Sequence, residues 1–344
     1  MEDIRGMSLE ALKNYMVASG EKAFRAKQVY DWVVKGVSDF DAMSNLSKPV
    51  IEKLKKAFVI DNAKIIEKLE SADGTIKSLH QLSDGNVIES VFMTYKHGYS
   101  ACISTQVGCR MNCAFCASTL GGMARNLKTS EMLGQIYEIQ NETGKRIDHV
   151  VLMGSGEPLD NYDEVLGFIK AACDETGLNL SGRNITLSTC GLVPKIYQLA
   201  DEQLQITLAI SMHNPFNEER AEIMPVTKKY PIEEIVKAVS YYIEKTNRRV
   251  TFEYALIEGE NDTERHAEAL GKLLKGKLVH VNLIPINEVA ERGMKPSLQK
   301  QINRFKDILM NKYKVNTTVR RELGSDINAA CGQLRNQHVK TLII

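Results

Sequence analysis

The chain has 344 residues, of which 43% are hydrophobic and 25% are charged, and its formal net charge is +1. These values are typical of a folded globular protein and exclude a largely disordered chain. No apolar stretch approaches the roughly 18 residues of a membrane span, and residues 1–5 include acidic side chains and lack the apolar run of a secretion signal. The composition therefore predicts a cytoplasmic protein without a membrane partner, and the near-neutral charge gives no indication of a nucleic-acid partner.

The first 97 residues change from a helical to a strand-like pattern. Residues 1–58 predict short helices, the first of which follows Ser8 as its N-cap and ends at Gly20. Residues 59–97 predict strands separated by Asp-Gly turns. We expect a small helical accessory domain over 1–58 and a β-hairpin extension over 59–97. The further helices are expected at 24–35 and 49–58, and the strands at 65–69, 75–82 and 87–95.

From residue 98 onward, predicted strands and helices alternate, which is typical of βα units around a parallel sheet. Six strands suit a partial (β/α)6 barrel over 98–315, with its active site at the carboxyl ends of the strands. A C-terminal strand and loop follow over 316–344. The strands are expected at 101–105, 149–153, 184–188, 205–212, 250–257, 279–285 and 317–320, and the helices near 130–142, 162–176, 193–201, 231–246, 262–275 and 298–313.

Three cysteines follow the first barrel strand in the spacing Cys-x3-Cys-x2-Cys, at Cys109, Cys113 and Cys116. A [4Fe–4S] cluster is normally held by four thiolates, so three would leave one iron open. S-adenosylmethionine carries an amine and a carboxylate that could chelate this iron. Zinc sites usually present two Cys-x2-Cys pairs, and seven cysteines in a long chain fit a disulfide framework poorly. The loop therefore predicts a [4Fe–4S] cluster that binds S-adenosylmethionine.

Further polar and glycine residues fall at the ends of the other predicted strands. Glycine lets the backbone approach a ligand closely, and carboxylate, hydroxyl and amide groups could bind the ammonium, ribose or carboxylate of a cofactor. Each motif alone is weak, because Gly-x-Gly is commonly a turn and a lone histidine is often structural. Their recurrence at one rim predicts a cofactor site formed by Gly156, Glu157, Ser188, Ser211, Met212, His213 and Asn287.

The cysteine loop resembles that of the radical S-adenosylmethionine superfamily, and the rest of the chain resembles its RlmN family of RNA adenine-C2 methyltransferases. The resemblance implies a partial radical-SAM barrel. Pro158 is similar to the RlmN pattern, where the related Cfr-type C8-methyltransferases tend to have alanine, whereas Ser155 and Met212 depart slightly from it. The segments that carry the resemblance are 104–109, 153–161, 187–191 and 327–334.

This resemblance implies a mechanism that uses two molecules of S-adenosylmethionine per turnover. The first methylates Cys331, and the cluster held by the three loop cysteines splits the second to give a radical. This radical takes a hydrogen from methylated Cys331, and the resulting carbon radical adds to adenine C2. Cys102 then releases the RNA by forming a disulfide with Cys331. Glu89 matches the proton acceptor of the family, and whether Glu89 or Cys102 removes the C2 proton stays open.

The resemblance also implies the partners, which are 23S rRNA near the peptidyl-transferase centre, certain tRNAs beside the anticodon, and an electron donor such as a flavodoxin. A monomer is the default. Within 1–58, the lysines Lys53, Lys55 and Lys56 are candidates for an RNA platform. Cys190 lies in a predicted turn and is interpreted as structural. Two alternatives stay open, a C8-methyltransferase of the Cfr type and a non-catalytic iron–sulfur sensor that binds RNA.

Overall fold

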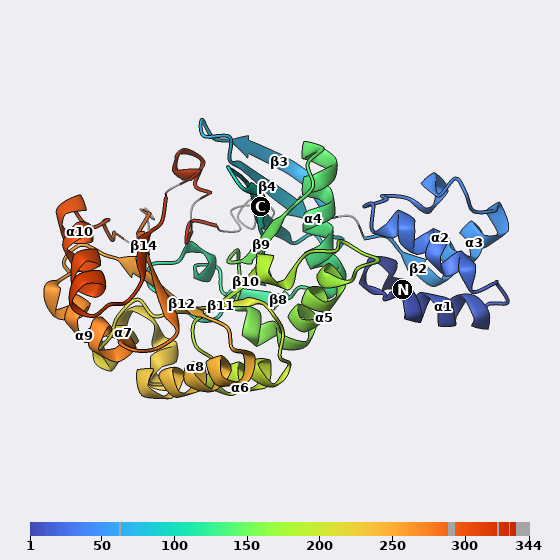
Figure 1. Ribbon diagram of the computed structural model, residues 1–344. Helices are drawn as coiled ribbons and strands as arrows, with labels where there is room; N and C mark the ends of the chain where they lie inside the picture. The colour runs from blue at the N-terminus through green and yellow to red at the C-terminus, as the bar shows by residue number, and fades with distance from the viewer. Residues whose placement is uncertain (62, 288–292, 322, 330, 335–344) are drawn as a thin grey trace.

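The computed structural model describes residues 1–61, 63–287, 293–321, 323–329 and 331–334. A ten-stranded curved sheet forms the body of the molecule (Figure 1). Seven neighbouring strands are parallel, and three antiparallel strands continue the same sheet at one edge. In spatial order the strands are β14 (Thr317–Val319), β13 (Val279–Pro285), β12 (Val250–Leu256), β11 (Thr207–Ser211), β10 (Ile185–Thr189), β9 (His149–Leu152), β6 (Gly98–Cys102), β5 (Val87–Tyr95), β4 (Ile76–Gln81) and β3 (Lys64–Glu70).

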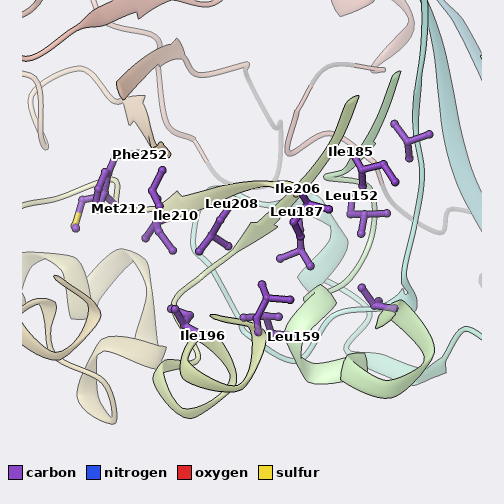
Figure 2. Packing of buried hydrophobic residues seen from close by; sticks show 14 of the residues in the cluster. Leu152, Leu159, Ile185, Leu187, Ile196, Ile206, Leu208, Ile210, Met212 and Phe252 are labelled. Carbon is purple, nitrogen blue, oxygen red and sulfur yellow. The ribbon is translucent and has the colours of Figure 1, made fainter. Parts of the chain in front are cut away.

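Helices connect the parallel strands and cover the outer face of the curved sheet (Figure 1). Successive side chains of each strand point alternately to this outer face and to the inside of the curve, as the period-2 pattern requires. In β10, Ile185 and Leu187 are fully buried, whereas Ser188 is only partly buried. Figure 2 shows the packing of the buried cluster, where Leu208 and Phe252 join Leu187. The helices are α4 (Thr129–Thr143), α5 (Tyr162–Cys173), α6 (Val193–Asp201), α7 (Asn217–Ile223), α8 (Ile232–Thr246), α9 (Glu264–Leu274) and α10 (Gln299–Asp307).

The predicted partial barrel is therefore confirmed, and β13 has the bounds that the sequence predicted. Two elements near the cysteine loop were not predicted. The first is a short hairpin of β7 (Gln106–Gly108) and β8 (Met123–Asn126), whose strands are too short to give a pattern. The second is α7, whose sequence is mostly charged and lacks the apolar spacing of an amphipathic helix. The last predicted helix ends in a π-helical turn at Ile308–Lys312.

The N-terminal residues form a helical module with a hydrophobic core of its own, which contains Leu12, Met43 and Leu54. The module consists of α1 (Leu9–Ala18), α2 (Phe24–Val33) and α3 (Lys48–Ala57), closed by β1 (Glu2–Asp3) pairing with β2 (Phe58–Val59). Ser8 caps α1 as predicted, because its hydroxyl accepts a hydrogen bond from the Ala11 amide at 3.1 Å. Among the described residues, no helix is long and apolar enough to cross a membrane.

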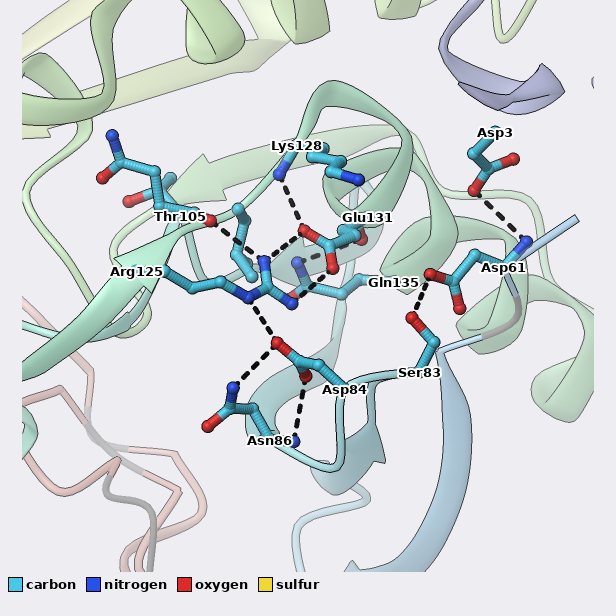
Figure 3. Close-up of polar contacts among 12 residues, drawn as sticks. Asp3, Asp61, Ser83, Asp84, Asn86, Thr105, Arg125, Lys128, Glu131 and Gln135 are labelled. Carbon is cyan, nitrogen blue, oxygen red and sulfur yellow. Dashed lines mark hydrogen bonds and ion pairs between the residues drawn. The ribbon is translucent and has the colours of Figure 1, made fainter. Parts of the chain in front are cut away.

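The antiparallel edge of the sheet is tied to the cysteine-loop side of the barrel by Arg125 of β8. Its guanidinium donates to Asp84, in the turn between β4 and β5, and to both carboxylate oxygens of Glu131 in α4 (Figure 3). The hydrogen bond from Arg125 lowers the pKa of Asp84 to about 2. Arg125 therefore fixes the extension relative to the hairpin from which the cysteine loop emerges.

Candidate active site

A cavity of about 160 Å³ lies at the carboxyl ends of the parallel strands. The strand order predicted this position, because parallel strands place their carboxyl ends at one rim. Ten of the thirteen residues predicted as site residues line it, while Met212, Cys102 and Glu89 do not. The ten are Cys109, Cys113, Cys116, Gly156, Glu157, Ser188, Ser211, His213, Asn287 and Cys331.

Main-chain hydrogen bonds and one glycine fix the cysteine loop at the wall of this cavity. Gly108 has φ +76°, and a Cβ there would lie 2.0 Å from the carbonyl oxygen of Gly122, so only glycine fits. The next amide, that of Cys109, donates to the same carbonyl at 2.9 Å. Farther along, the Ala114 amide donates to the Ile223 carbonyl at the end of α7, at 2.8 Å. The loop is thus held at both ends by other parts of the barrel.

The loop thiols have the chemistry of a metal-binding set. Burial raises the pKa of Cys109 to about 12, and burial followed by repulsion from the other two thiols raises the pKa of Cys113 well above its usual value. Cationic iron would offset both effects, because a coordinated thiol is deprotonated. No three His, Cys, Asp or Glu side chains within the described ranges surround one point as the ligands of a single ion do. In a [4Fe–4S] cluster each thiolate binds a different iron, so its ligands need not surround one ion.

Glu157 is buried beneath the cavity and connects two strand ends. One carboxylate oxygen accepts from the Leu159 amide at 2.9 Å, and the other accepts from the Cys190 amide at 2.7 Å. Burial raises the pKa of Glu157. Neighbouring Gly156 has φ +112°, and a Cβ there would lie 2.7 Å from the side chains of Thr105 and Gln106. Glu157 therefore orders the cavity floor, and its predicted contact with an ammonium stays a prediction.

Several polar side chains line the cavity and could bind a ligand. The hydroxyl oxygens of Ser188 and Ser211 lie 3.5 Å apart on neighbouring strands. The Asn287 amide nitrogen donates to the Cys331 carbonyl at 3.4 Å, while its buried Oδ1 has no hydrogen-bond partner among the described residues. A buried acceptor without a donor is costly, so Asn287 fits a ligand that brings a donor such as an ammonium or a ribose hydroxyl.

Met212 and His213 take different positions although they are neighbours. The Met212 side chain is fully buried in the main core (Figure 2) and does not line the cavity, and its amide donates to the Glu253 carbonyl at 3.0 Å. His213 lines the cavity, and its Nδ1 accepts a hydrogen bond from the Ala255 amide at 2.9 Å. Burial lowers the pKa of His213 to about 3. This histidine is therefore neutral and carries its proton on Nε2. The Phe115 ring packs edge-on against it, with 4.7 Å between the two ring centroids.

Cys331 lines a second, smaller cavity of about 40 Å³ as well as the first. Cys102, at the end of β6, lines the smaller cavity, together with Tyr95 and Arg320. Burial, and then the charge of Cys331, raise the pKa of Cys102 to about 12. Both cysteines are free thiols. Cys331 thus lies between the cysteine-loop cavity and Cys102, which is the position that a carrier between the two sites needs.

Glu89 is buried and lines neither cavity, although Val91, Met93 and Tyr95 of the same strand line the smaller one. Its carboxylate forms an ion pair of 3.7 Å with Lys77 of β4, and both side chains are buried. Lys77 also donates to the carbonyl of Asn328 at 3.2 Å, three residues before Cys331. Lys77 therefore connects Glu89 to the segment that carries Cys331.

The C-terminal segment that carries Cys331 is held from two sides. The turn between β3 and β4 holds one side, where Asp73 accepts from the Gly324 amide at 2.9 Å and Ser71 donates to Asp326 at 2.6 Å. On the other side, the Ala117 amide, next to the cysteine loop, donates to the Gly332 carbonyl at 2.7 Å. These contacts place Cys331 above the loop.

The chain matches two family models. The model of the radical SAM superfamily matches residues 103–270, and that of the ribosomal RNA large subunit methyltransferase N-terminal domain matches residues 2–60. The probable dual-specificity RNA methyltransferase RlmN of Clostridium tetani is 55% identical over 341 residues, which cover 99% of this chain and 97% of that relative. The chain belongs to the RlmN family of radical SAM RNA methyltransferases.

Other comparisons agree with this family. The RlmN protein of Clostridium beijerinckii is also 55% identical, over 342 residues that cover 99% of this chain and 97% of that relative. A radical SAM methyltransferase from Sphaerobacter thermophilus, known from its crystal structure, has a TM-score of 0.94 and 38% identity, with 98% of this chain and all of that one covered. The family uses a [4Fe–4S] cluster and S-adenosylmethionine, two molecules per turnover.

Among the side chains near the site that were not predicted as functional, three have notable contacts or burial. Cys190, interpreted as structural, lines the large cavity, and its amide donates to the Glu157 carboxylate. Arg320 lines both cavities, and Arg220 is fully buried behind the strand ends. Arg320 ends the strand predicted at 317–320, so its strand-end position could have identified it, whereas Arg220 lies in a mostly charged segment that gave no signal.

Proposed function

We propose that this protein methylates C2 of adenine in 23S rRNA, and the corresponding atom of an adenine beside the anticodon of certain tRNAs, through S-methylated Cys331. The observation that carries this proposal is that Cys331 lines both the cysteine-loop cavity and the cavity of Cys102. A single thiol can therefore take up a carbon on one side and be attacked by a second thiol on the other. The relatives' description as dual-specificity RNA methyltransferases supports both kinds of RNA.

Cys109, Cys113 and Cys116 would hold the cluster, which when bound supplies the electron for the reductive cleavage of S-adenosylmethionine. Ser188, Ser211 and Asn287 would orient the cofactor, because their polar atoms face the cavity. His213 contributes a neutral donor, since its pKa of about 3 keeps it uncharged.

Cys331 has the two tasks of carrying the carbon and of releasing the product. Its thiolate first accepts the methyl group at sulfur. When this carbon is joined to the adenine, the Cys102 thiolate attacks the Cys331 sulfur, so that a disulfide forms and the carbon–sulfur bond breaks. The electron pair of that bond passes to the carbon, which takes up a proton to complete the methyl group. A thiol reductant then regenerates both cysteines.

The geometry favours Cys102 over Glu89 as the group that contacts the adenine, because Cys102 lines a cavity and Glu89 does not. The variant Glu89→Gln separates the two possibilities. If Cys102 removes the C2 proton, Glu89→Gln protein retains turnover, whereas a covalent RNA adduct in this variant would assign the proton to Glu89.

We also propose that the helical module contacts RNA, with a narrower set of lysines than the sequence indicated. Lys53 is paired with Glu21 at 2.5 Å and Lys55 with Asp41 at 2.7 Å, so their charges are partly offset. Lys56 is exposed on the same helix. Lys56→Glu should raise the KM for RNA more than Lys53→Glu does, and equal KM values for both variants and the wild type would refute this role.

The test of the proposed function is a digest of RNA after reaction. Anaerobically reconstituted protein, S-adenosylmethionine, a reductant and an rRNA or tRNA fragment should yield 2-methyladenosine, and Cys331→Ala protein should yield none. 8-Methyladenosine as the main product would establish the C8 reaction instead, and absence of any reductive cleavage would indicate a sensor. A flavodoxin as electron donor and a monomeric state remain predictions, tested by reduction with flavodoxin and by light scattering.

A further inference from the structure

Arg220 is the largest fully buried side chain in the described part of the chain. It belongs to α7, and its guanidinium lies behind the strand ends that form the cavity. The same helix ends at Ile223, whose carbonyl accepts the hydrogen bond from Ala114 between two loop cysteines. Burying an arginine is costly, so its surroundings must account for it.

All three nitrogen atoms of the Arg220 guanidinium donate hydrogen bonds, four in total, but every acceptor is neutral and none balances the positive charge. Nε donates to the Met212 carbonyl at 2.9 Å, and Nη1 donates to the Thr227 hydroxyl at 2.7 Å. Nη2 donates to the carbonyls of Cys190 at 2.9 Å and Ser211 at 2.8 Å. Three of the four acceptors are main-chain oxygens at the ends of two strands, so this side chain fixes the rim of the cavity.

No carboxylate of the described residues forms an ion pair with Arg220. The adjacent Glu219 is engaged elsewhere, with Arg265 and His266 at 2.7 Å each. Its Nη2 contacts the Cys190 carbonyl, and Cys190 packs with Cys113 of the loop in one buried cluster. The thiols of these two cysteines are the ionisable groups that act on the Arg220 charge. A buried cation without an anion is strongly unfavourable unless a charge of opposite sign lies nearby. The protein thus presents an unbalanced positive charge beside a cysteine of the loop.

We propose that Arg220 is a positioning residue that balances the negative charge of the iron–sulfur cluster and sets its reduction potential. This inference rests on the proposed binding of the cluster by the loop cysteines. A thiolate-ligated cluster is more negative after reduction, so a nearby cation stabilises the reduced form and raises the potential. The hydrogen bonds of Arg220 separately hold the carbonyls of Ser211 and Cys190, which shapes the wall where S-adenosylmethionine would bind.

Two substitutions separate charge from hydrogen bonding. Arg220→Met removes both, whereas Arg220→Lys keeps the charge and loses most of the bonds. Arg248→Met is the matched control, because Arg248 lies just before β12, at the opposite end of the strands, and donates to a backbone carbonyl at 3.4 Å. For each protein we would measure iron content, the midpoint potential by titration with detection of the reduced cluster by electron paramagnetic resonance, and the Kd for S-adenosylmethionine.

We expect a more negative midpoint potential in Arg220→Met and values equal to the wild type in Arg220→Lys and Arg248→Met. The Kd for S-adenosylmethionine should rise in both Arg220 variants and not in the control. A potential in Arg220→Lys that differs from the wild type would overturn the role of the charge, even if Arg220→Met does not fold. The proposed function would instead be overturned if the wild-type protein binds no cluster. It would also be overturned if the Cys113→Ala variant binds as much cluster as the wild type.

Discussion

The two walls of the active site are held in different ways. The cysteine loop is fixed by main-chain hydrogen bonds to Gly122 and Ile223 and by a glycine that no other residue can replace. The C-terminal segment with Cys331 is held largely by polar side chains of the antiparallel edge, namely Ser71, Asp73 and Lys77. A cluster needs a wall that does not move. The proposed reaction brings Cys331 to a cofactor, an RNA base and Cys102 in turn, so the wall that carries it must allow small movements.

Removal of a loop cysteine should have the largest effect. Cys113→Ala leaves two thiols for the cluster, so we expect loss of bound iron and sulfide and no RNA methylation. Cys173→Ala is the control, because Cys173 lies at the end of α5 and lines neither cavity. Iron analysis after anaerobic reconstitution checks this, and a full cluster in Cys113→Ala would show that the loop is not the ligand set.

Removal of the second thiol should stop the reaction at a later step. Cys102→Ala lacks the nucleophile that attacks Cys331, so the protein should accumulate as a covalent adduct with RNA. A shifted band in a denaturing gel that disappears on ribonuclease treatment would measure it. Free methylated RNA at the wild-type rate would exclude Cys102 from product release.

Loosening the C-terminal segment should have an intermediate effect and leave the cluster in place. Asp326→Ala removes the acceptor of bonds from the Ser71 hydroxyl and the Ala72 amide. We expect Cys331 to react severalfold faster with an alkylating reagent, as measured by peptide mass analysis. Asp163→Ala, in the first turn of α5 and lining neither cavity, should leave the rate unchanged. An unchanged rate in Asp326→Ala would show that the antiparallel edge does not hold this segment.

The smallest effect concerns pH. Hydrogen bonds from Thr75 and the Gly324 amide outweigh partial burial and lower the pKa of Asp73 to about 2. Because the folded-state pKa lies below the usual value, the stabilisation is complete above that usual value and is lost only as the pH falls through about 2. Hydrogen exchange of the Gly324 amide, corrected for its intrinsic rate, should therefore show equal protection at pH 7 and pH 5. Loss of protection at pH 5 would contradict this.

The sequence was informative where the chemistry is local. The spacing of Cys109, Cys113 and Cys116 predicted the loop, and the alternation of strands and helices placed ten predicted residues around one cavity. Met212 shows the limit of this reasoning, because the position at a strand end was right but the side chain points into the core. Strand-end position alone does not decide which face a side chain takes.

Contacts between distant parts of the chain could not be predicted from the sequence. Ser71 and Asp326 are 255 residues apart, and nothing in the local sequence of either residue indicates that they are partners. Arg220 lies in a charged helix where exposure is the ordinary expectation, and only the fold shows that it is buried against three strand-end carbonyls. The pairing of Glu89 with Lys77 depends on the register of β4 and β5 and was equally invisible.

The most direct test of the account follows the methyl group. S-adenosylmethionine with a fully deuterated methyl group is supplied to reconstituted protein with reductant and an rRNA fragment, and the nucleosides are analysed by mass. Because one deuterium is removed while the carbon is attached to Cys331, we expect 2-methyladenosine with two deuterium atoms. A methyl group with all three deuterium atoms would indicate direct transfer to the base and would contradict the role of Cys331 as carrier.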